Sequence, residues 1–472
     1  MRWQVSLLIA VALLGASCTS ESAEGENGAS ASQSSALAYE YPAPPPAPDG
    51  ALPPRTEKSL GRLVETLGQG PLDREAVDVM SRSNDARVGW FVSDLLRFIQ
   101  TGGDQVALVV AFQALTGVDP RDDPSFAQSA WLSITNHLIA WDLPAPPGYR
   151  ELKARLFLQI EPAWRPFFKD ESSAIDWRLI SWGGVFIDDR PEGDTDPCPR
   201  GCIPALDDPH LVSAADGDWY PDDRIVFGVV LDDEAVALPK HIMEVHEMVN
   251  MTIASQRVAI PYCTLCGSAQ AYLTESVPDG VAPSVLRTSG LLSRSNKVMY
   301  DLNTNSVLDT FTGRALSGPL HDAGVVLEQT SVVTSTWDAW KLAHPDTRIV
   351  AEDGGVGRTY PLDPLRGRDD DGPIFPIGPV DPRLPVQAQV LGVVTPSEEA
   401  LAFPVEQVRA ALSEGRRVAI EGIEVVADGG GLRARTEGRA ELATHQAFWF
   451  AWSQFHPDTA VWTPLGQSRE DS

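Results

Sequence analysis

Phe227-Gly-Val-Val-Leu-Asp-Asp-Glu-Ala-Val-Ala-Leu-Pro239 recurs later in the chain as Leu391-Gly-Val-Val-Thr-Pro-Ser-Glu-Glu-Ala-Leu-Ala-Phe-Pro404. A second similar pair follows in the same order, Trp337-Asp-Ala-Trp-Lys-Leu-Ala-His-Pro-Asp-Thr347 and Trp449-Phe-Ala-Trp-Ser-Gln-Phe-His-Pro-Asp-Thr459. Two markers in one order indicate a duplicated module. The short apolar runs around them, separated by turn residues, are typical of strands. We therefore predict a β-rich module over residues 183–350 and a shortened second copy over 351–465.

The part of the chain before this domain, residues 56–182, has the periodicity of helices. Apolar residues recur at three- and four-residue spacing in 88–99 and 105–115, and the pattern continues in 127–139 and 149–168. Glycine- and proline-containing breaks separate these segments. The predicted fold class is therefore α+β, with an all-helical, helical-repeat-like domain followed by the β-rich domain.

The N-terminal residues indicate export. Arg2 precedes an apolar run, Val5 to Leu14, that is too short to span a bilayer, and Gly15-Ala-Ser-Cys18 follows it. Residues 1–18 thus resemble a bacterial lipoprotein signal peptide with Cys18 as the lipidated residue. The alternative is an ordinary secretory signal in which Cys18 is incidental. Either interpretation predicts an exported protein of the cell envelope, in the periplasm or on the outer surface.

Residues 19–55 have a composition that cannot bury a core. They are rich in Ser, Ala, Glu and Gly and then in proline, which predicts a disordered tether followed by a stiffer extended spacer. The formal net charge is -28, from 37 Lys and Arg against 65 Asp and Glu. Such an acidic chain does not favour nucleic acid or anionic headgroups. The expected partners are the membrane, through the lipid anchor, and another envelope protein.

Cys263-Thr-Leu-Cys266-Gly267 carries the clearest chemical signal. An apolar run, 258–262, precedes it and a strand-like run, 268–273, follows it. This context favours a knuckle, in which both sulfurs lie on one side and glycine lets backbone N–H groups approach them. A thioredoxin-type pair would instead stand at a helix N-terminus. The motif can close a disulfide, exchange electrons or supply half of a metal site.

The chain has five cysteines, an odd number for an exported protein. If Cys18 carries lipid, the remaining four are Cys198, Cys202, Cys263 and Cys266. An oxidising compartment favours two disulfides, with three connectivities open. Four thiolates would instead suit a tetrahedral metal site. Both alternatives stay open at the level of sequence.

His246 is the other candidate ligand, on a helix predicted over Pro239–Asn250. His246-Glu-Met-Val-Asn250 lacks the second histidine of the zinc-protease helix, which excludes that class. The candidate metal ligands are therefore Cys263, Cys266, His246, Cys198 and Cys202, with zinc or another transition metal as the cofactor. Copper is a minority option, since Met243, Met248 and Met251 lie nearby; their positions favour core packing over ligation.

Several motifs occur together in a fixed order, and they are Ile203-Pro-Ala-Leu-Asp-Asp-Pro209, the helix with His246 to Asn250, Tyr262-Cys-Thr-Leu-Cys-Gly-Ser268, Ser289-Gly-Leu-Leu292, Met299-Tyr-Asp301 and Trp337 to Thr347. In this order they resemble the exported bacterial family called domain of unknown function 3179. The resemblance covers about residues 180–350, with a shortened second copy to about 462. It implies no established activity, and it makes the cysteine turn and His246 the shared candidates.

The chain departs from that family's pattern at three places. Thr264 stands where the family has proline, and Arg294-Ser-Asn-Lys297 replaces Asn-Ser-x-Leu. The Cys198-Pro-Arg-Gly-Cys202 segment is a local addition.

Three hypotheses follow for an extracytoplasmic, lipid-anchored protein of unknown activity. The first is a metal-binding or thiol redox site in the first β-rich module. The second is a disulfide-stapled structural or interaction module without catalysis. The third is an enzyme with a cleft lined by Cys263, His246 and Glu247. Substrate, metal identity, disulfide connectivity and oligomeric state stay open.

Overall fold

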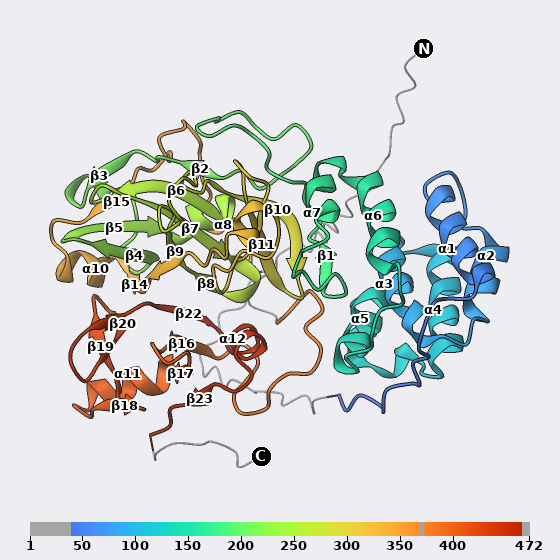
Figure 1. Ribbon diagram of the computed structural model, residues 1–472. Coiled ribbons are helices and arrows are strands. Elements are labelled where there is room, and N and C mark those ends of the chain that lie inside the picture. Colours follow the sequence, from blue (N-terminus) through green and yellow to red (C-terminus); the bar gives the residue numbers. More distant parts are fainter. Residues whose placement is uncertain (1–38, 368–371, 465–472) are drawn as a thin grey trace, which may run out of the picture. The chain divides into compact units, whose positions relative to one another are not determined.

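Helices fill the N-terminal part of the described chain, and short strands fill most of the rest (Figure 1). The computed structural model describes residues 39–367 and 372–464. The expected signal peptide, Cys18 and the serine-rich part of the tether lie outside these ranges. Within them, no helix combines the length and the apolar character needed to cross a bilayer.

The helical region contains α1 Pro54–Thr66, α2 Arg74–Ser81, α3 Gly89–Phe98, α4 Gly102–Thr116, α5 Ala130–Ala140, α6 Tyr149–Ile160 and α7 Arg165–Lys169. The expected helices at 88–99, 105–115 and 127–139 are confirmed to within a few residues. The predicted 149–168 helix is interrupted after α6, because Pro162 has no N–H to continue the ladder. The Glu161 carboxylate accepts the Ala163 N–H at 3.1 Å and begins a new turn there.

The proline-rich spacer is described from Tyr39 onward, has no helix or strand before α1, and contacts α5 and Trp141 at its start. The Trp141 indole N–H donates to the Pro42 carbonyl at 2.7 Å, and the Tyr39 hydroxyl lies 3.2 Å from His137 Nε2. The Tyr41 ring packs edge-on against the His137 ring, with centroids 5.2 Å apart. The segment has no helical or strand periodicity, and its contacts with this helix and Trp141 come from Tyr39, Tyr41 and the Pro42 carbonyl. The spacer therefore contacts the helical region at Tyr39, Tyr41 and Pro42.

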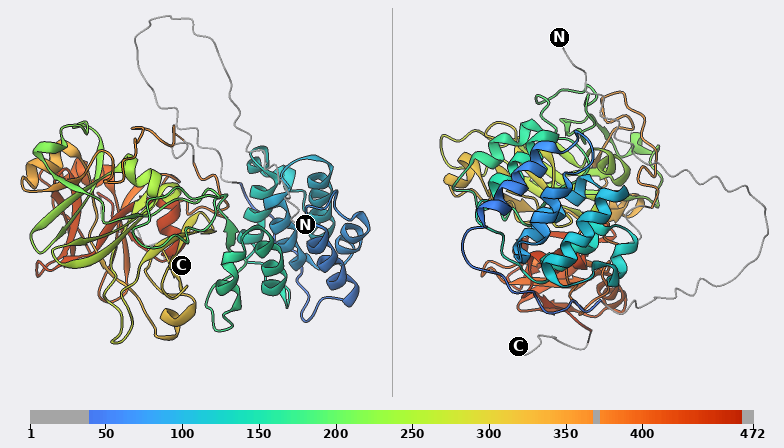
Figure 2. Two further views of the ribbon diagram at one scale, coloured as in Figure 1. Left: turned by 90° about the horizontal axis from the view of Figure 1, so that it is seen from above. Right: turned by 90° about the vertical axis from the view of Figure 1, so that its right-hand side faces the viewer.

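The described strands form five small sheets, and Figure 2 shows them from two further directions. The first sheet contains, in spatial order, β1 Ile180–Trp182, β10 Leu286–Ser293, β11 Asn296–Asp301 and β12 Val307–Asp309. The second contains β13 Glu328–Thr330, β9 Ala271–Leu273, β7 Gln256–Cys263, β6 Met248–Ile253 and β2 Leu206–Asp207, and β8 Ser268–Ala269 pairs with β7. The third is β14 Val333–Thr336, β4 Ile225–Leu231, β5 Glu234–Pro239, β15 Arg348–Val350 and β3 Leu211–Ser213. The last two are β22 Thr444–Phe448, β16 Gln389–Val394, β17 Ala400–Pro404 and β23 Ala460–Val461, and β18 Val418–Ile420, β19 Ile423–Asp428, β20 Gly431–Thr436 and β21 Glu441–Leu442. The helices of this part are α8 Lys240–His246, α9 Gly318–Asp322, α10 Trp337–Ala343, α11 Val405–Ser413 and α12 Trp449–Phe455.

The repeated sequence markers form the same local structure twice. β4 pairs antiparallel with β5, and β16 pairs antiparallel with β17. Gly228 lies under the Trp340 ring and Gly392 under the Trp452 ring, so close that a Cβ at either glycine would overlap the ring. Each of these indoles donates to a threonine seven residues later, Trp340 to Thr347 at 2.9 Å and Trp452 to Thr459 at 3.0 Å. The markers therefore specify packing, whereas the duplication itself stays a prediction.

The helix expected over Pro239–Asn250 is shorter than predicted. α8 ends at His246, because Glu247 takes a left-handed conformation with φ 51° and its N–H closes on the Met243 carbonyl at 2.7 Å. The chain then enters β6, which pairs along its length with β7. Asn250 therefore belongs to β6 and not to the helix that carries His246. Pairing with β7 outweighs the local helical pattern.

The helical region and the first sheet share one hydrophobic core, which includes Leu291, Val298, Tyr300 and Val307. The Trp164 indole donates to the Ser289 carbonyl of β10 at 2.7 Å. The β10 strand therefore contacts the helices, while β11 carries Lys297 toward the cysteine turn.

A candidate dithiol site

The cysteine motif forms the predicted knuckle between two strands. β7 ends at Cys263, a 3-10 turn covers Thr264–Cys266, and β8 pairs back on β7. Gly267 closes the turn with φ 58°, a conformation that favours glycine. A Cβ at this position would also lie 2.9 Å from the Phe448 ring. The turn thus needs glycine for both its conformation and its packing.

The two thiols of the knuckle lie side by side without a bond between them. Their sulfurs are 2.9 Å apart, and both residues are buried. Cys266 Sγ lies 3.6 Å from the Ser295 carbonyl and 3.5 Å from Asn296 Oδ1, both polar acceptors at the start of β11. The Ser295 carbonyl also lies 3.9 Å from Cys263 Sγ, so both thiols contact it, while the Asn296 contact belongs to Cys266.

The surroundings make the two thiols chemically unequal. Burial by itself raises the pKa of Cys263, but the Cys266 thiol, the Lys297 backbone N–H and the Lys297 ammonium outweigh it, and the pKa lies below its usual value. Burial and the neighbouring Cys263 hold the pKa of Cys266 well above the usual value. Cys263 is therefore the thiol that ionises first, and Cys266 keeps its proton.

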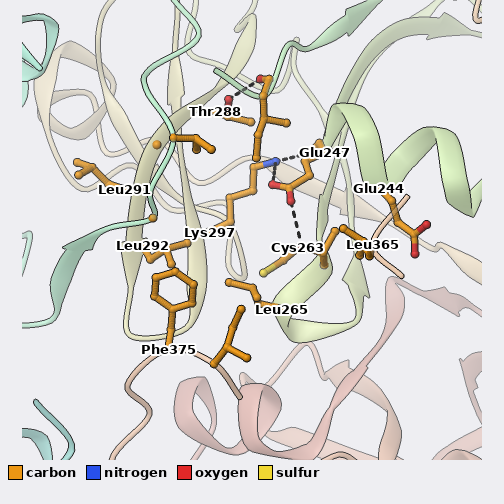
Figure 3. A pocket seen from close by; sticks show the side chains of 16 residues that line it. Glu244, Glu247, Cys263, Leu265, Thr288, Leu291, Leu292, Lys297, Leu365 and Phe375 are labelled. Carbon is orange, nitrogen blue, oxygen red and sulfur yellow. Dashed lines mark hydrogen bonds and ion pairs between the residues drawn. The ribbon is translucent and has the colours of Figure 1, made fainter. Parts of the chain in front are cut away.

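Lys297 and Glu247 complete the polar part of the site (Figure 3). The Lys297 ammonium contacts the Glu247 carbonyl and lies 3.5 Å from Glu247 Oε2. The Thr264 hydroxyl donates to Glu247 Oε1 at 3.1 Å, which ties the cysteine turn to this carboxylate. Burial lowers the pKa of Lys297, while Glu247 and Cys263 oppose that shift. The positive charge of the Lys297 ammonium thus interacts with the negative charge of the Glu247 carboxylate and with that of the Cys263 thiolate when it forms.

A pocket of about 210 Å³ gives access to this group. Cys263, Thr264, Lys297 and both Glu244 and Glu247 line it, and most of the other lining is apolar, from Val185, Ile203, Leu265, Leu291, Leu292, Leu365, Ile374 and Phe375. Cys266 is not part of the lining and lies behind Cys263. A reagent in the pocket would therefore meet Cys263 before Cys266.

His246 does not belong to this pocket. Its Nδ1 lies 2.7 Å from the Pro204 carbonyl and its Nε2 lies 2.7 Å from the Tyr360 hydroxyl. It lines a separate cavity of about 400 Å³ together with Arg190 and Arg358. Burial lowers the pKa of His246 to about 4, so the ring is neutral and both nitrogens are engaged. The cleft expected to combine Cys263, His246 and Glu247 contains only the first and the last of them.

The other two cysteines of the described chain form a disulfide with each other. Cys198 and Cys202 are bonded to each other, with their Cα atoms 5.4 Å apart. Asp188 lies beside them. Among residues 39–367 and 372–464, Asp188, Cys198 and Cys202 are the one set of three or more His, Cys, Asp or Glu residues whose ligand atoms all lie within 4.8 Å of one another. The Asp188 oxygens already accept Arg190 Nε at 2.6 Å and the Ala205 N–H at 2.7 Å. This Asp/Cys group could hold a metal ion, and it would offer thiolates only after reduction of the disulfide.

The five predicted metal ligands therefore divide among three places, and no third histidine, cysteine or acidic ligand of the described chain joins Cys263 and Cys266 within 4.8 Å. The three methionines near His246 are core residues: Met243 and Met251 pack in one cluster and Met248 in another. The structure thus supports the packing role expected for them.

Lys297 was missed at the level of sequence. The strand Asn296–Asp301 is buried on both faces, and Lys297 is its one lysine. Because Lys is rarely fully buried without a partner, this lysine could have indicated a buried ion pair. Its partner Glu247 is fifty positions earlier in the chain, so the pair is visible only in the fold.

The fold and the site define an α+β protein with a helical region, a β-rich domain of small sheets and a buried dithiol beside a lysine and a glutamate. The chain belongs to the family described as Protein of unknown function (DUF3179), whose model matches residues 200–443, more than half of its 472 residues. The family resemblance expected from the motifs is thereby confirmed. Neither the curated proteins nor the solved structures include a match to this chain.

Proposed function

We propose that this protein carries out thiol–disulfide exchange, with Cys263 as the attacking thiolate and Cys266 as the resolving thiol. The observation that carries the proposal is the pair of adjacent, unbonded thiols, of which one lines a pocket with a lowered pKa and the other is buried behind it. Such an asymmetric pair suits exchange, because the thiolate is the nucleophile of the first step and the neighbouring thiol stays protonated until the second step.

The exchange balances within the site. The Cys263 thiolate attacks one sulfur of a disulfide RS–SR′, forms a mixed disulfide Cys263–SR and releases R′S⁻. Cys266 then passes its proton to the released R′S⁻ and attacks Cys263 Sγ, which releases RS⁻ and closes the Cys263–Cys266 disulfide. Two electrons pass from the dithiol to the disulfide substrate. The 2.9 Å separation of the sulfurs supports the second step, because little movement is needed to form the bond.

The asymmetry arises without a helix dipole. The knuckle has no helix behind Cys263, and the Lys297 backbone N–H and ammonium favour its thiolate instead. The expected metal-binding role is less well supported, because a tetrahedral site needs ligands beyond Cys263 and Cys266 and the described residues bring none close to both sulfurs. Zinc or copper at this pair would need ligands from elsewhere.

Equilibration in defined mixtures of reduced and oxidised glutathione tests the proposal. The variant Cys198→Ser/Cys202→Ser leaves the knuckle pair as the cysteines of the β-rich part, and mass spectrometry then reads their redox state directly. We expect a reversible transition in which two hydrogen atoms are lost on oxidation. Matched Cys263→Ser and Cys266→Ser variants should each abolish the internal disulfide, and only Cys266→Ser should accumulate a mixed disulfide through Cys263.

A pair that stays reduced in every mixture would contradict exchange. Stoichiometric metal in anaerobically purified protein, lost in Cys263→Ser, would favour the metal role instead. We further propose that exchange takes place in the cell envelope, where disulfides persist. That location is supported by the sequence of the first 18 residues, which lie outside the described ranges.

A further inference from the structure

A small cavity of about 10 Å³ lies where three elements meet, apart from the dithiol pocket. Arg97 reaches it from α3, Ser181 from β1, and Arg294 from the turn between β10 and β11. The Arg294 N–H donates to the Leu179 carbonyl at 2.8 Å, which fixes this turn against the segment that enters β1. The cavity therefore sits at the junction between the helical region and the first sheet.

Arg97 brings a positive charge to the cavity without an acidic partner. Its Nε donates to the Trp182 carbonyl at 2.6 Å, and its guanidinium lies over the Trp131 and Trp182 rings, 4.7 and 5.5 Å from their centroids. Burial lowers the pKa of Arg97 to about 10, and no carboxylate of the described chain opposes that shift. Aromatic faces and one carbonyl only partly replace the water that this charge has lost.

Arg294 brings a second unbalanced charge. Its Nη1 donates to the Gln454 carbonyl at 3.3 Å, while its Nε is buried and has no hydrogen-bond partner. Burial and the charge of Arg178 lower the pKa of Arg294, and Asp176 and Asp142 oppose that shift. The Ser181 hydroxyl is likewise buried without a partner. Buried donors in this state cost free energy unless an acceptor reaches them.

The other charged groups around the cavity are already paired. Asp94 accepts Lys153 Nζ at 2.8 Å and the Tyr149 hydroxyl at 2.7 Å, so its charge is balanced by lysine. Arg178 contacts Asp176 at 2.6 Å and Asp142 at 2.8 Å. The lining therefore keeps a surplus of positive charge from Arg97 and Arg294.

We infer that this cavity is a binding site for a small inorganic anion of the size of chloride, held between Arg97 and Arg294 with the Ser181 hydroxyl as a neutral donor. The volume is that of about one water-sized sphere, which admits a single-atom anion and excludes a nucleotide or a sugar phosphate. An anion there compensates two partly buried guanidiniums at once. It also ties the helices to the first sheet, since Arg97 belongs to the former and Arg294 to the latter.

An anion that binds the folded chain alone raises its stability. The test compares melting temperatures in sodium chloride and in sodium gluconate at equal ionic strength and pH. We expect a saturable upward shift in chloride, because gluconate is too large for the cavity. The shift should disappear in Arg97→Gln and in Arg294→Gln. It should persist in Arg62→Gln, a control at a partly exposed arginine that is paired with Asp73 on the helical surface.

Anomalous scattering from crystals grown in sodium bromide gives a readout that needs no variant. A bromide peak between Arg97 and Arg294 is expected in the unaltered protein. The proposal is overturned if the cavity shows no peak, if chloride and gluconate give equal melting temperatures, or if both arginine variants keep the chloride shift.

Discussion

Lys297 and Glu247 act on Cys263 with opposite sign, so the thiol pKa is set by two residues that can be changed separately. The ammonium lowers the pKa of Cys263 and the carboxylate raises it. Lys297→Met should therefore slow alkylation of Cys263 near pH 7, and Glu247→Gln should accelerate it. The change is about tenfold for each unit by which the pKa moves, as long as the thiol is mostly protonated. Iodoacetamide rates over a pH series measure the effect.

The same pH series contains its own control. At high pH both variants should reach the rate of the unaltered chain, because the thiolate is then fully formed in each. A change in that limiting rate with no movement of the midpoint would mean that the two residues govern access to the pocket rather than ionisation.

His246 makes stability depend on pH. Its pKa in the folded chain is about 4, below the ordinary value of 6.5, because the buried ring loses solvation when it is charged. The unfolded chain therefore takes up this proton first, and the stabilisation present above pH 6.5 is lost as the pH falls toward 4. The loss is at most about 3 kcal/mol, from 1.36 kcal/mol for each pKa unit.

Urea denaturation from pH 7 to pH 4 measures this loss. The free energy of unfolding should fall less steeply in His246→Asn, which has no ring to protonate, than in the unaltered chain. His241, His445 and His456 also have lowered pKa values, so a residual slope common to both proteins is expected. Identical slopes would show that folding does not lower the pKa of His246.

At the scale of elements, two hairpins depend on a glycine under a tryptophan. Gly228→Ala would bring a Cβ within 2.5 Å of the Trp340 ring, and Gly392→Ala would do the same at Trp452. Both indoles are buried and bonded to threonine, so neither ring can move easily. Each substitution should lower stability by about 1–3 kcal/mol through overpacking. Thermal unfolding measures the loss.

Gly438→Ala is the matched control for these two variants, since the nearest atom to its Cβ, Thr436 Oγ1, is 3.6 Å away. Its melting temperature should stay close to that of the unaltered chain. If Gly392→Ala were tolerated while Gly228→Ala was not, the second hairpin would have looser packing than its sequence similarity indicates.

The elements also show which structural features could be predicted from local sequence patterns and which could not. The strand-turn-strand form of 256–269 was predictable, because the apolar runs and the glycine that specify it are adjacent in the chain. The end of α8 at His246 was not, because the helical pattern continues past it and the pairing of β6 with β7 decides. The docking of Tyr39 and Tyr41 on α5 was missed for the same reason, since their partner His137 is about a hundred positions away.

At the scale of the whole molecule, the lipid anchor stays a prediction that one variant can test. Cys18→Ser should move the protein from the membrane fraction to the soluble fraction, because the acylated thiol would be the attachment point. Cys198→Ser/Cys202→Ser should leave it in the membrane fraction. Centrifugal fractionation with immunodetection measures both, and an unaltered distribution in Cys18→Ser would favour the ordinary secretory signal.

The succession of helices and short strands, the family, and the knuckle around Cys263 and Cys266 follow from local sequence, because each rests on periodicity or on neighbouring residues. Which candidate residues meet depends on the fold. It put Lys297 and Glu247 beside Cys263, turned His246 toward Pro204 and Tyr360, and joined Cys198 to Cys202. The physical reason is that ion pairs, hydrogen bonds and thiol contacts act over a few ångströms in space. Strand pairing between distant segments sets those distances, and spacing along the chain does not.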